Sequence, residues 1–200
     1  MAAIYTGGML YTGKGDNGTT KLFGCDQRLS KSSAIAEALG SVDEINALLG
    51  VLKMKGGETN AVSGLTYHAL LSDTQQDLFV VQAQLAGAEK QMDIMRVAKV
   101  EGWINAIEKE LPPITTFFVS GGTELGALAD FARTVARRAE RRVVAALEEE
   151  FPRGTLGSER VFLGNNKDLC AYMNRLSSLL YALARLANHR AGVSEEKPHY

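Results

Sequence analysis

TELGALADFARTVARRAERRVVAALEEE, residues 123–150, is the stretch that decides the fold class. Its apolar side chains recur at steps of three and four residues, which is the period of one face of an α-helix. They are Leu128, Phe131, Val135, Ala139, Val143 and Leu147. Pro152 and Gly154 follow and end the pattern. The sequence therefore predicts a long helix with one buried face.

Four further segments show the same period, namely 30–54, 65–90, 93–110 and 167–190. For the first of them, Ser30 is the expected N-cap and Gly56-Gly57 the expected stop. A short extended piece is expected at 115–119, and the Gly-rich first 29 residues are expected to form a loop. We therefore expect an all-α fold: one domain, residues 1–200, built as a five-helix bundle with an extended Gly-rich N-terminal loop.

Composition excludes several classes of protein. The 200 residues are 46% hydrophobic with a formal net charge of −1, so no basic field indicates a nucleic-acid or membrane partner. Two distant cysteines form no disulfide framework and fit a reducing, cytoplasmic setting. The three histidines lack metal-ligand spacing. No segment has the pattern of a secretory signal or a membrane span.

The segment Thr12–Thr20, TGKGDNGTT, is the most unusual part of the chain, and we call it the Gly-rich loop. Glycines allow a backbone to approach an anion closely, and Lys14 adds a donor, so a polyphosphate would suit it. Gly13, Gly15 and Gly18 spell GxGxxG, but the strand and helix that flank a dinucleotide-binding turn are missing from the pattern. The alternative is a turn-rich terminus without a ligand.

Five arginines crowd residues 133–142 with one glutamate among them. Four of these residues share a helix face by spacing: Arg133, Arg137, Glu140 and Arg141. Arg138 and Arg142 form a second row. The plain interpretation is a solvated charged face. The other is a phosphate site, with Glu140 either paired to an arginine or holding Mg²⁺.

One polar residue stands out in the last apolar helix. Asn174 lies among leucines and needs hydrogen-bond partners if it is buried. On its own it favours a structural network between helices over a ligand contact.

Four motifs, taken together and in order, resemble those of the PduO-type ATP:cob(I)alamin adenosyltransferases. They are TGKGDNGTTKL (12–22), VDEINALLG (42–50), RTVARRAERRVV (133–144) and YMNRLSSLLYALAR (172–185). The resemblance spans nearly the whole chain. It implies a five-helix bundle that assembles as a homotrimer with sites between subunits. It also implies transfer of the 5′-deoxyadenosyl group of ATP to cob(I)alamin, with release of triphosphate.

The resemblance also assigns roles to residues. Arg137 and Glu140 match the arginine and glutamate of the ATP and Mg²⁺ site, and Phe117, or else Phe118, matches the aromatic residue below the corrin ring. Asp43 matches a carboxylate that pairs across the subunit interface with an arginine, here Arg133. The full expected ATP set is Thr12, Gly13, Lys14, Gly15, Asp16, Gly18, Thr20, Lys31, Arg133, Arg137, Arg138, Glu140, Arg141 and Asn174.

The chain departs from the family pattern at two positions. Relatives commonly read LPGG where this chain has Val119-Ser120-Gly121-Gly122, and NRLSD where it ends in Ser178. The missing aspartate leaves the ATP set intact. Partners expected beyond the substrates are a cobalamin reductase or an adenosylcobalamin-dependent enzyme. The rival interpretations are a module that binds the same ligands without turnover, and a helical protein whose arginines bind an acidic partner.

Overall fold

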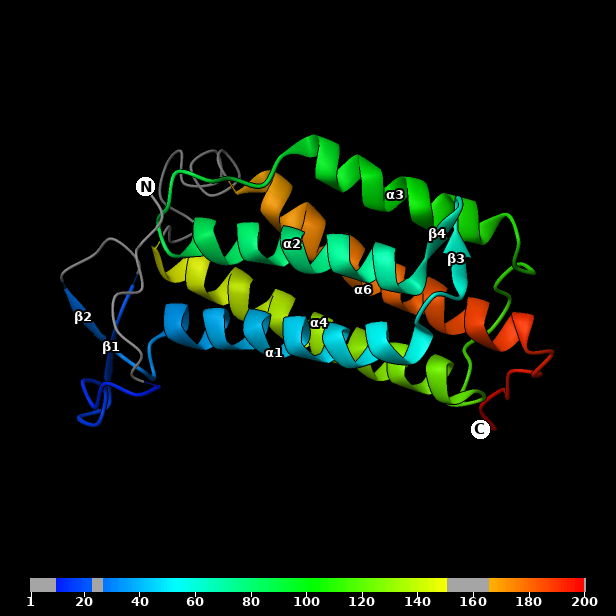
Figure 1. Ribbon diagram of the computed structural model, residues 1–200, viewed down its shortest axis with the longest axis horizontal. Helices are drawn as coiled ribbons and strands as arrows, with labels where there is room; N and C mark the ends of the chain where they lie inside the picture. Colours follow the sequence, from blue (N-terminus) through cyan, green and yellow to red (C-terminus); the bar gives the residue numbers. More distant parts are fainter. Residues whose placement is uncertain (1–9, 23–26, 151–165, 200) are drawn as a thin grey trace.

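The computed structural model describes residues 10–22, 27–150 and 166–199. Five helices make up most of this part of the chain (Figure 1). They are α1 (Ala34–Gly56), α2 (Tyr67–Leu85), α3 (Ile94–Glu108), α4 (Glu124–Glu150) and α6 (Lys167–Arg190). The predicted all-α class and the five predicted helices are confirmed.

The helices run lengthwise beside one another, as Figure 1 shows, and α4 packs against both α1 and α6. Each helix turns most of its apolar stripe inward, so that Leu49, Leu78, Val143 and Leu180 are fully buried. Phe131 of the predicted α4 stripe is an exception and is 57% exposed. Truncating one such leucine to alanine typically costs about 2–5 kcal/mol, which shows how strongly this packing fixes the position of α4.

Helix ends differ from the sequence predictions where capping decides them. α1 begins after Ser33, whose hydroxyl accepts a hydrogen bond from the amide of Ala36 at 3.4 Å, so the prediction of Ser30 as N-cap was wrong. α2 ends five residues early because Gly87 has a φ of 83°, which a right-handed helix cannot continue. The other three helices agree with their predicted bounds within two residues.

Two short antiparallel hairpins were missed. β1 (Thr19–Lys21) pairs with β2 (Arg28–Ser30), so part of the predicted N-terminal loop is a hairpin. β3 (Asn60–Val62) pairs with β4 (Leu65–Thr66) through a two-residue turn in which both residues have positive φ, as tight hairpins require. The expected extended piece at 115–119 contains no strand and belongs to an irregular connection between α3 and α4.

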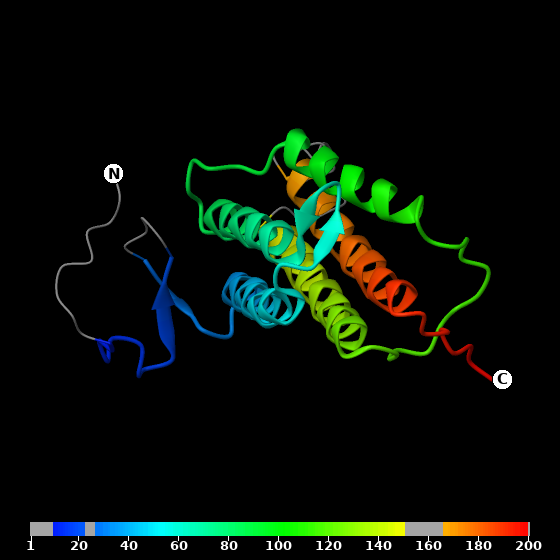
Figure 2. The same cartoon turned by 45° about the vertical axis from the view of Figure 1, so that its right-hand side comes forward.

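The β1–β2 hairpin stands beyond the end of the bundle at which α1 begins (Figure 2). The opposite end of the bundle holds the connection between α3 and α4 and the C-terminal residues (Figures 1 and 2). The β1–β2 hairpin and the α3–α4 connection therefore lie at opposite ends of the bundle. Among the described residues, the structure contains no helix long and apolar enough to cross a bilayer.

Candidate active site

The outward face of α4 carries the predicted arginine site. Alanines and valines between the arginines are buried against α1 and α6, so the arginine side chains point away from the core. A cavity of about 340 Å³, which we call the polar cavity, lies on this face. Its lining includes Arg137, Glu140 and Arg141 of α4 and Asn174 of α6. Three of the four α4 residues predicted to share one face thus line one cavity, whereas the fourth, Arg133, lines a different one.

Glu140 and Asn174 are in direct contact, although 34 residues separate them in the sequence. The Nδ2 atom of Asn174 donates to Oε1 of Glu140 at 2.9 Å, and Arg175 donates to Oδ1 of Asn174 at 2.8 Å. Asn174 is exposed, so it does not belong to a buried network within the core. Its polar atoms are instead fixed at the rim of the polar cavity.

The second row of arginines has carboxylate partners on α1. Arg138 pairs with Glu44 at 2.5 Å, and Arg142 lies 3.5 Å from Glu37. These pairs neutralise charges that the sequence of α4 leaves unbalanced. The predicted contact of Arg138 with ATP stays a prediction.

The first row is neutralised only at its start. The Nε atom of Arg133 donates to Asp130 at 2.5 Å. Arg141 donates to the backbone carbonyl of Arg137 at 3.0 Å, which holds its side chain along the helix. Within the described residues, Arg137 forms no ion pair. The guanidinium groups of Arg137 and Arg141 are therefore the ones that remain able to bind an anion, although Glu140 and Glu148 line the same cavity.

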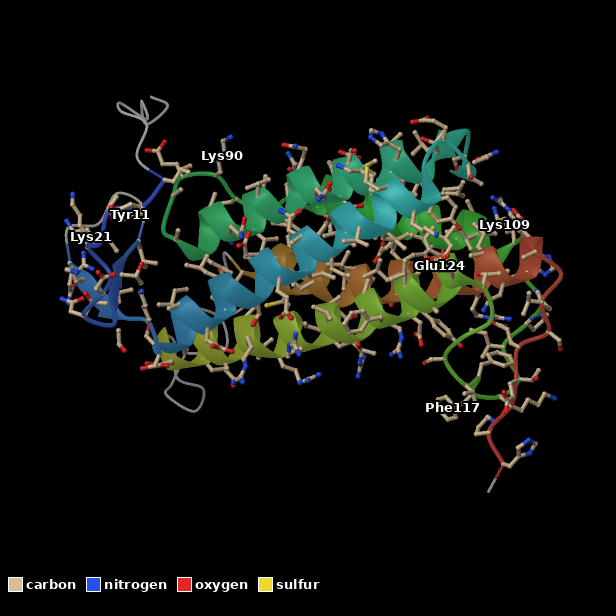
Figure 3. The ribbon with its side chains drawn as sticks, turned by 60° about the horizontal axis from the view of Figure 1, so that its bottom comes forward. Tyr11, Lys21, Lys90, Lys109, Phe117 and Glu124 are labelled. Carbon is tan, nitrogen blue, oxygen red and sulfur yellow. The ribbon has the colours of Figure 1, made fainter. Side chains whose placement is uncertain are left out.

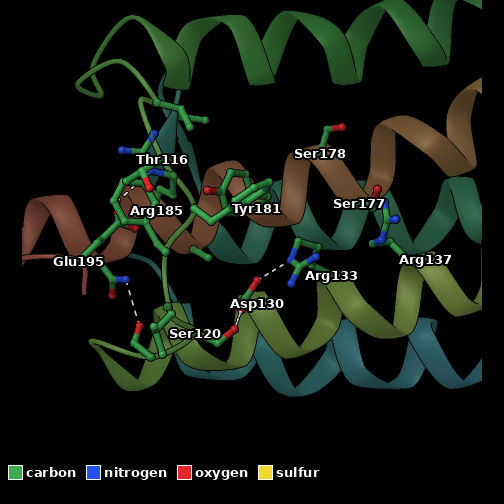
Figure 4. A pocket seen from close by; sticks show the side chains of 18 of the residues that line it. Thr116, Ser120, Asp130, Arg133, Arg137, Ser177, Ser178, Tyr181, Arg185 and Glu195 are labelled. Carbon is green, nitrogen blue, oxygen red and sulfur yellow. Dashed lines mark hydrogen bonds and ion pairs between the residues drawn. The ribbon is translucent and has the colours of Figure 1, made fainter. Parts of the chain in front are cut away.

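A second cavity, of about 680 Å³, lies next to the first, and we call it the large cavity (Figure 4). Its walls come from α4, α6, the α3–α4 connection and the C-terminal tail. Arg137 lines both cavities. Both serines of the family departures, Ser120 and Ser178, also line the large cavity. The guanidinium group of Arg137 thus lies on the wall of both the smaller and the larger cavity.

Two aromatic residues of the connection line the large cavity. Phe117 is 78% exposed and projects from the end of the molecule opposite Tyr11 and Lys21 (Figure 3). Phe118 is half-buried, and the guanidinium of Arg185 lies 5.0 Å from its ring centre. Neither ring belongs to the buried core of the described residues. Because Phe117 lies on the wall of the large cavity, its ring is open to whatever occupies that space.

Asn188 was missed by sequence reasoning, and it fixes the end of the connection. It accepts a hydrogen bond from the amide of Thr123 at 2.9 Å and donates to the carbonyl of Gly121 at 3.0 Å. A Cβ atom at Gly122 or Gly126 would lie only 2.6 or 2.4 Å from its side-chain oxygen, so a larger residue at either position would displace Asn188 from these hydrogen bonds. Asn188 offered the same signal as Asn174, a polar residue in an apolar helix.

Arg185 was missed too, and it joins the connection to the C-terminal tail. Its side chain is only 5% exposed, pairs with Glu195 at 3.0 Å and approaches the carbonyl of Pro112 at 3.4 Å. Nearby on α6, burial raises the pKa of Tyr181, so its hydroxyl is neutral at physiological pH. These residues make the large cavity a preformed space with a mostly uncharged α6 wall.

The Gly-rich loop is ordered by its own contacts. Gly13 and Gly18 have φ values of 66° and 77°, which glycine adopts readily. A Cβ at Gly15 would lie 3.0 Å from Nζ of Lys31, so the predicted lysine does lie against the loop. Arg28, which the sequence analysis did not single out, donates to the carbonyl of Lys14 at 2.5 Å.

Some backbone amides of the loop are already used. Those of Asp16 and Gly18 donate to carbonyls within the loop, and that of Thr19 donates to Asn17. An anion would therefore meet the lysine side chains and the remaining amides, rather than a full cradle of N–H groups.

The loop and the α4 arginines do not meet within one chain. Between described residues, no hydrogen bond or ion pair joins Thr12–Thr20 to α4. Asp43 is exposed on α1, while Arg133 already has Asp130 of its own chain as partner. The predicted site residues thus fall into two groups, and one chain brings together only the members within each group.

Comparison with known proteins fits this geometry. The sequence model of the cobalamin adenosyltransferase family matches residues 10–187. The chain belongs to this family. It is 35% identical over 189 residues to the corrinoid adenosyltransferase PduO of Citrobacter freundii, covering 91% of this chain and 50% of the relative. It is 33% identical to the corrinoid adenosyltransferase of Bacillus subtilis, covering 93% of this chain and 90% of that protein.

Solved structures of this family share the fold. A variant of the PduO-type ATP:corrinoid adenosyltransferase of Lactobacillus reuteri, complexed with cobalamin and ATP, superposes with a TM-score of 0.77 at 27% identity. The match covers 96% of this chain and 100% of that one. A second variant of that enzyme, complexed with ATP, gives a TM-score of 0.75 at 28% identity, over 95% of this chain and 100% of that one. The chain spans about half the length of the two PduO relatives, from Citrobacter freundii and Salmonella typhimurium.

Proposed function

We propose that this chain transfers the 5′-deoxyadenosyl group of ATP to cob(I)alamin, forming adenosylcobalamin and triphosphate. The observation that carries the proposal is the position of Arg137 between two adjoining cavities. The polar cavity suits a triphosphate, and the large cavity suits a corrin ring. Relatives named as corrinoid adenosyltransferases, and a related structure that holds cobalamin and ATP, support the same pair of substrates.

The phosphate end of the reaction rests on Arg137 and Arg141. Guanidinium groups bind phosphate oxygens with two parallel hydrogen bonds, and Arg137 has no carboxylate among the described residues to compete for it. As the bond between C5′ and the triphosphate oxygen breaks, negative charge grows on the leaving group. A fixed guanidinium at that place stabilises the charge without reorganisation.

The residues at the polar cavity also fit a magnesium ion. Mg²⁺ is commonly held by one or two carboxylates plus the phosphates of a substrate, rather than by a protein cage. No cluster of three or more metal-ligating side chains occurs in the part of the chain that the structure describes. Glu140, whose carboxylate accepts a hydrogen bond from Asn174, would supply one such carboxylate. When bound, the ion would neutralise part of the phosphate charge.

The corrin end needs no protein base. Cob(I)alamin is itself the nucleophile, so its cobalt forms the new Co–C bond and triphosphate leaves with the C–O electron pair. What the protein must do is place the two substrates in line and exclude water. The exposed ring of Phe117 on the cavity wall is suited to cover the lower face of the corrin and to disfavour an axial ligand.

We further propose a cytoplasmic homotrimer in which the Gly-rich loop of one subunit reaches α4 of the next. The loop stands beyond the end of its own bundle and makes no hydrogen bond to its own α4 among the described residues (Figure 2). Exposed apolar side chains on α1 and α4, namely Val51, Met54 and Phe131, offer surface for subunit contact. Asp43 would then add a second carboxylate to a neighbour's Arg133.

The test is an assay of the purified chain with Mg-ATP and chemically reduced cobalamin. The expected result is adenosylcobalamin in its visible spectrum and triphosphate in a ratio of one to one. Binding of both substrates without triphosphate release would favour a carrier of the same ligands. If Mg-ATP neither binds nor raises the melting temperature, the proposal fails.

A further inference from the structure

Asp130 is a nearly buried carboxylate that holds two parts of the large cavity at once. It lies on α4 and is 8% exposed. Its Oδ2 accepts a hydrogen bond from the hydroxyl of Ser120, and its Oδ1 accepts from Nε of Arg133 at 2.5 Å (Figure 4). A carboxylate that accepts two such bonds keeps both donors in fixed places.

The bond to Ser120 matters because of what Ser120 belongs to. The α3–α4 connection carries Phe117 and Phe118 and has no regular secondary structure between residues 112 and 123. Asn188 of α6 holds its end, and the amide of Val119 donates to the carbonyl of Glu196 at 2.8 Å. Among described residues, the Ser120–Asp130 bond is the one side-chain hydrogen bond that ties residues 114–121 to α4.

Ser120 is also where this chain departs from the family pattern, which commonly has proline at that position. A proline stiffens the backbone by fixing φ, but it carries no hydroxyl to bond a carboxylate. In this chain a hydrogen bond to Asp130 takes the place of that stiffness. The departure therefore has a structural counterpart on the facing helix.

The second bond reaches the arginine row. Arg133 is directed by Asp130 toward Tyr181, with its guanidinium carbon 6.0 Å from the centre of that ring. One turn along α4, Arg137 stays without a carboxylate among described residues. Asp130 therefore holds Arg133 at the wall of the large cavity. Arg137, which lines both cavities, has no such carboxylate partner among the described residues.

We propose that Asp130 and Ser120 are positioning residues for the corrinoid half of the site, holding the Phe117 segment against α4. The inference rests on the proposed function, since it concerns how that site binds its corrinoid. It predicts a split between the two substrates. Losing the bond should weaken the use of cobalamin and leave the use of ATP unchanged.

The variants are Ser120→Ala, which removes the hydroxyl, and Ser120→Thr, which keeps it. Ser120→Ala should raise the KM for cob(I)alamin about tenfold, the size expected for one charge-assisted hydrogen bond, with the KM for ATP unchanged. Ser120→Thr should keep the KM for cob(I)alamin close to the wild-type value. Asp130→Asn should also raise the KM for cob(I)alamin, but it weakens the hold on Arg133 as well, so the prediction of an unchanged KM for ATP is tested with Ser120→Ala alone. Glu124→Gln, which removes another α4 carboxylate paired with Lys55 outside both cavities, is the matched control.

Three readouts separate a positioning role from general damage to the fold. Electron paramagnetic resonance of bound cob(II)alamin with ATP should show less four-coordinate Co(II) in Ser120→Ala than in the wild type. Hydrogen exchange of residues 114–121, measured without ligand, should be faster in Ser120→Ala alone among the serine variants. Melting temperatures of all variants show whether a loss reflects unfolding.

The outcomes are distinguishable. If the wild type makes no adenosylcobalamin, the proposed function fails, and the corrinoid role of these residues falls with it whatever the exchange data show. If the wild type is active and Ser120→Ala keeps the wild-type KM for cobalamin, the inference is overturned. Equal changes in both KM values, with a lower melting temperature, would also overturn it in favour of a purely structural bond.

Discussion

Two rows of arginine on one helix have different surroundings in this protein. Arg138 and Arg142 meet carboxylates of α1, at 2.5 and 3.5 Å. Arg137 and Arg141 face the polar cavity, and no carboxylate of the described residues pairs with them. The residue type, the helix and the spacing are the same, so the neighbouring helices decide what each row can do.

The neighbouring helices decide which arginines of the cluster remain able to bind an anion. Like charges four residues apart on a helix cost about 0.2–0.5 kcal/mol per pair, so a cluster of five arginines needs neutralisation. The fold supplies it for the row against α1 and for Arg133. What is left are the guanidinium groups of Arg137 and Arg141, which have no paired carboxylate among the described residues and share the polar cavity with Glu140 and Glu148. These two guanidinium groups are where we expect the substrate anion.

Of the variants considered, replacement of Arg137, which faces the polar cavity, should have the largest effect on turnover. Arg137→Ala should lower kcat/KM for ATP about 100- to 1,000-fold, as expected when a donor to developing charge is lost. Because the side chain is exposed, the melting temperature should change little. The control is Arg142→Ala, which removes an arginine of α4 that faces α1 instead of the cavity. Comparable losses in both variants, or none in either, would contradict the distinction between the rows.

Asn174 should show the next largest effect. Removing its contact with Glu140 by Asn174→Ala should weaken Mg-ATP binding about tenfold, the cost of one hydrogen bond to a charged group. Isothermal titration calorimetry measures it. Glu101→Gln breaks the nearby Arg175–Glu101 pair outside the cavities and serves as the control. Unchanged affinity in Asn174→Ala would remove this residue from the site.

Arg138 has two possible roles. The family resemblance implies a contact with ATP, whereas the structure pairs it with Glu44 of α1. We expect the ion pair to dominate. Arg138→Ala should lower the free energy of unfolding by up to about 1 kcal/mol, the range for an exposed pair, with ATP affinity changed less than about twofold. Denaturant unfolding and calorimetry measure the two quantities. A tenfold weaker affinity would support the ATP assignment instead.

Glu37→Gln should have the smallest effect. It frees Arg142 from a pair that is about half exposed on both sides and 3.5 Å long. The expected loss of stability is below about 0.5 kcal/mol, and turnover should stay at the wild-type value. A clear fall in turnover would mean that the α1 row takes part in the reaction.

The five helices and the outward face of α4 could be predicted from the sequence because both follow from the spacing of apolar residues. The buried stripe of α4 fixes which side chains point outward, and so Arg137, Glu140 and Arg141 were placed on one face correctly. The five helices follow from the same rule. Capping was harder, since Ser30 and Ser33 carry the same side chain and only the backbone geometry selects Ser33.

The rest depended on contacts distant in sequence. Nothing in the α4 sequence shows that Glu44 lies beside Arg138, 94 residues away. The anchors of the connection, Arg185 and Asn188, likewise act on residues more than 60 positions earlier. Motif spacing places residues on a helix face, but only the packing of the helices shows which of them already have partners.

The most direct test of this account is a crystal structure of the protein with Mg-ATP. The account predicts the triphosphate within hydrogen-bond distance of Arg137, with the Gly-rich loop and Lys31 of a neighbouring subunit closing over it. A triphosphate bound instead at the α1 row, beside Arg138 and Arg142, or one that meets no arginine of α4, would contradict it.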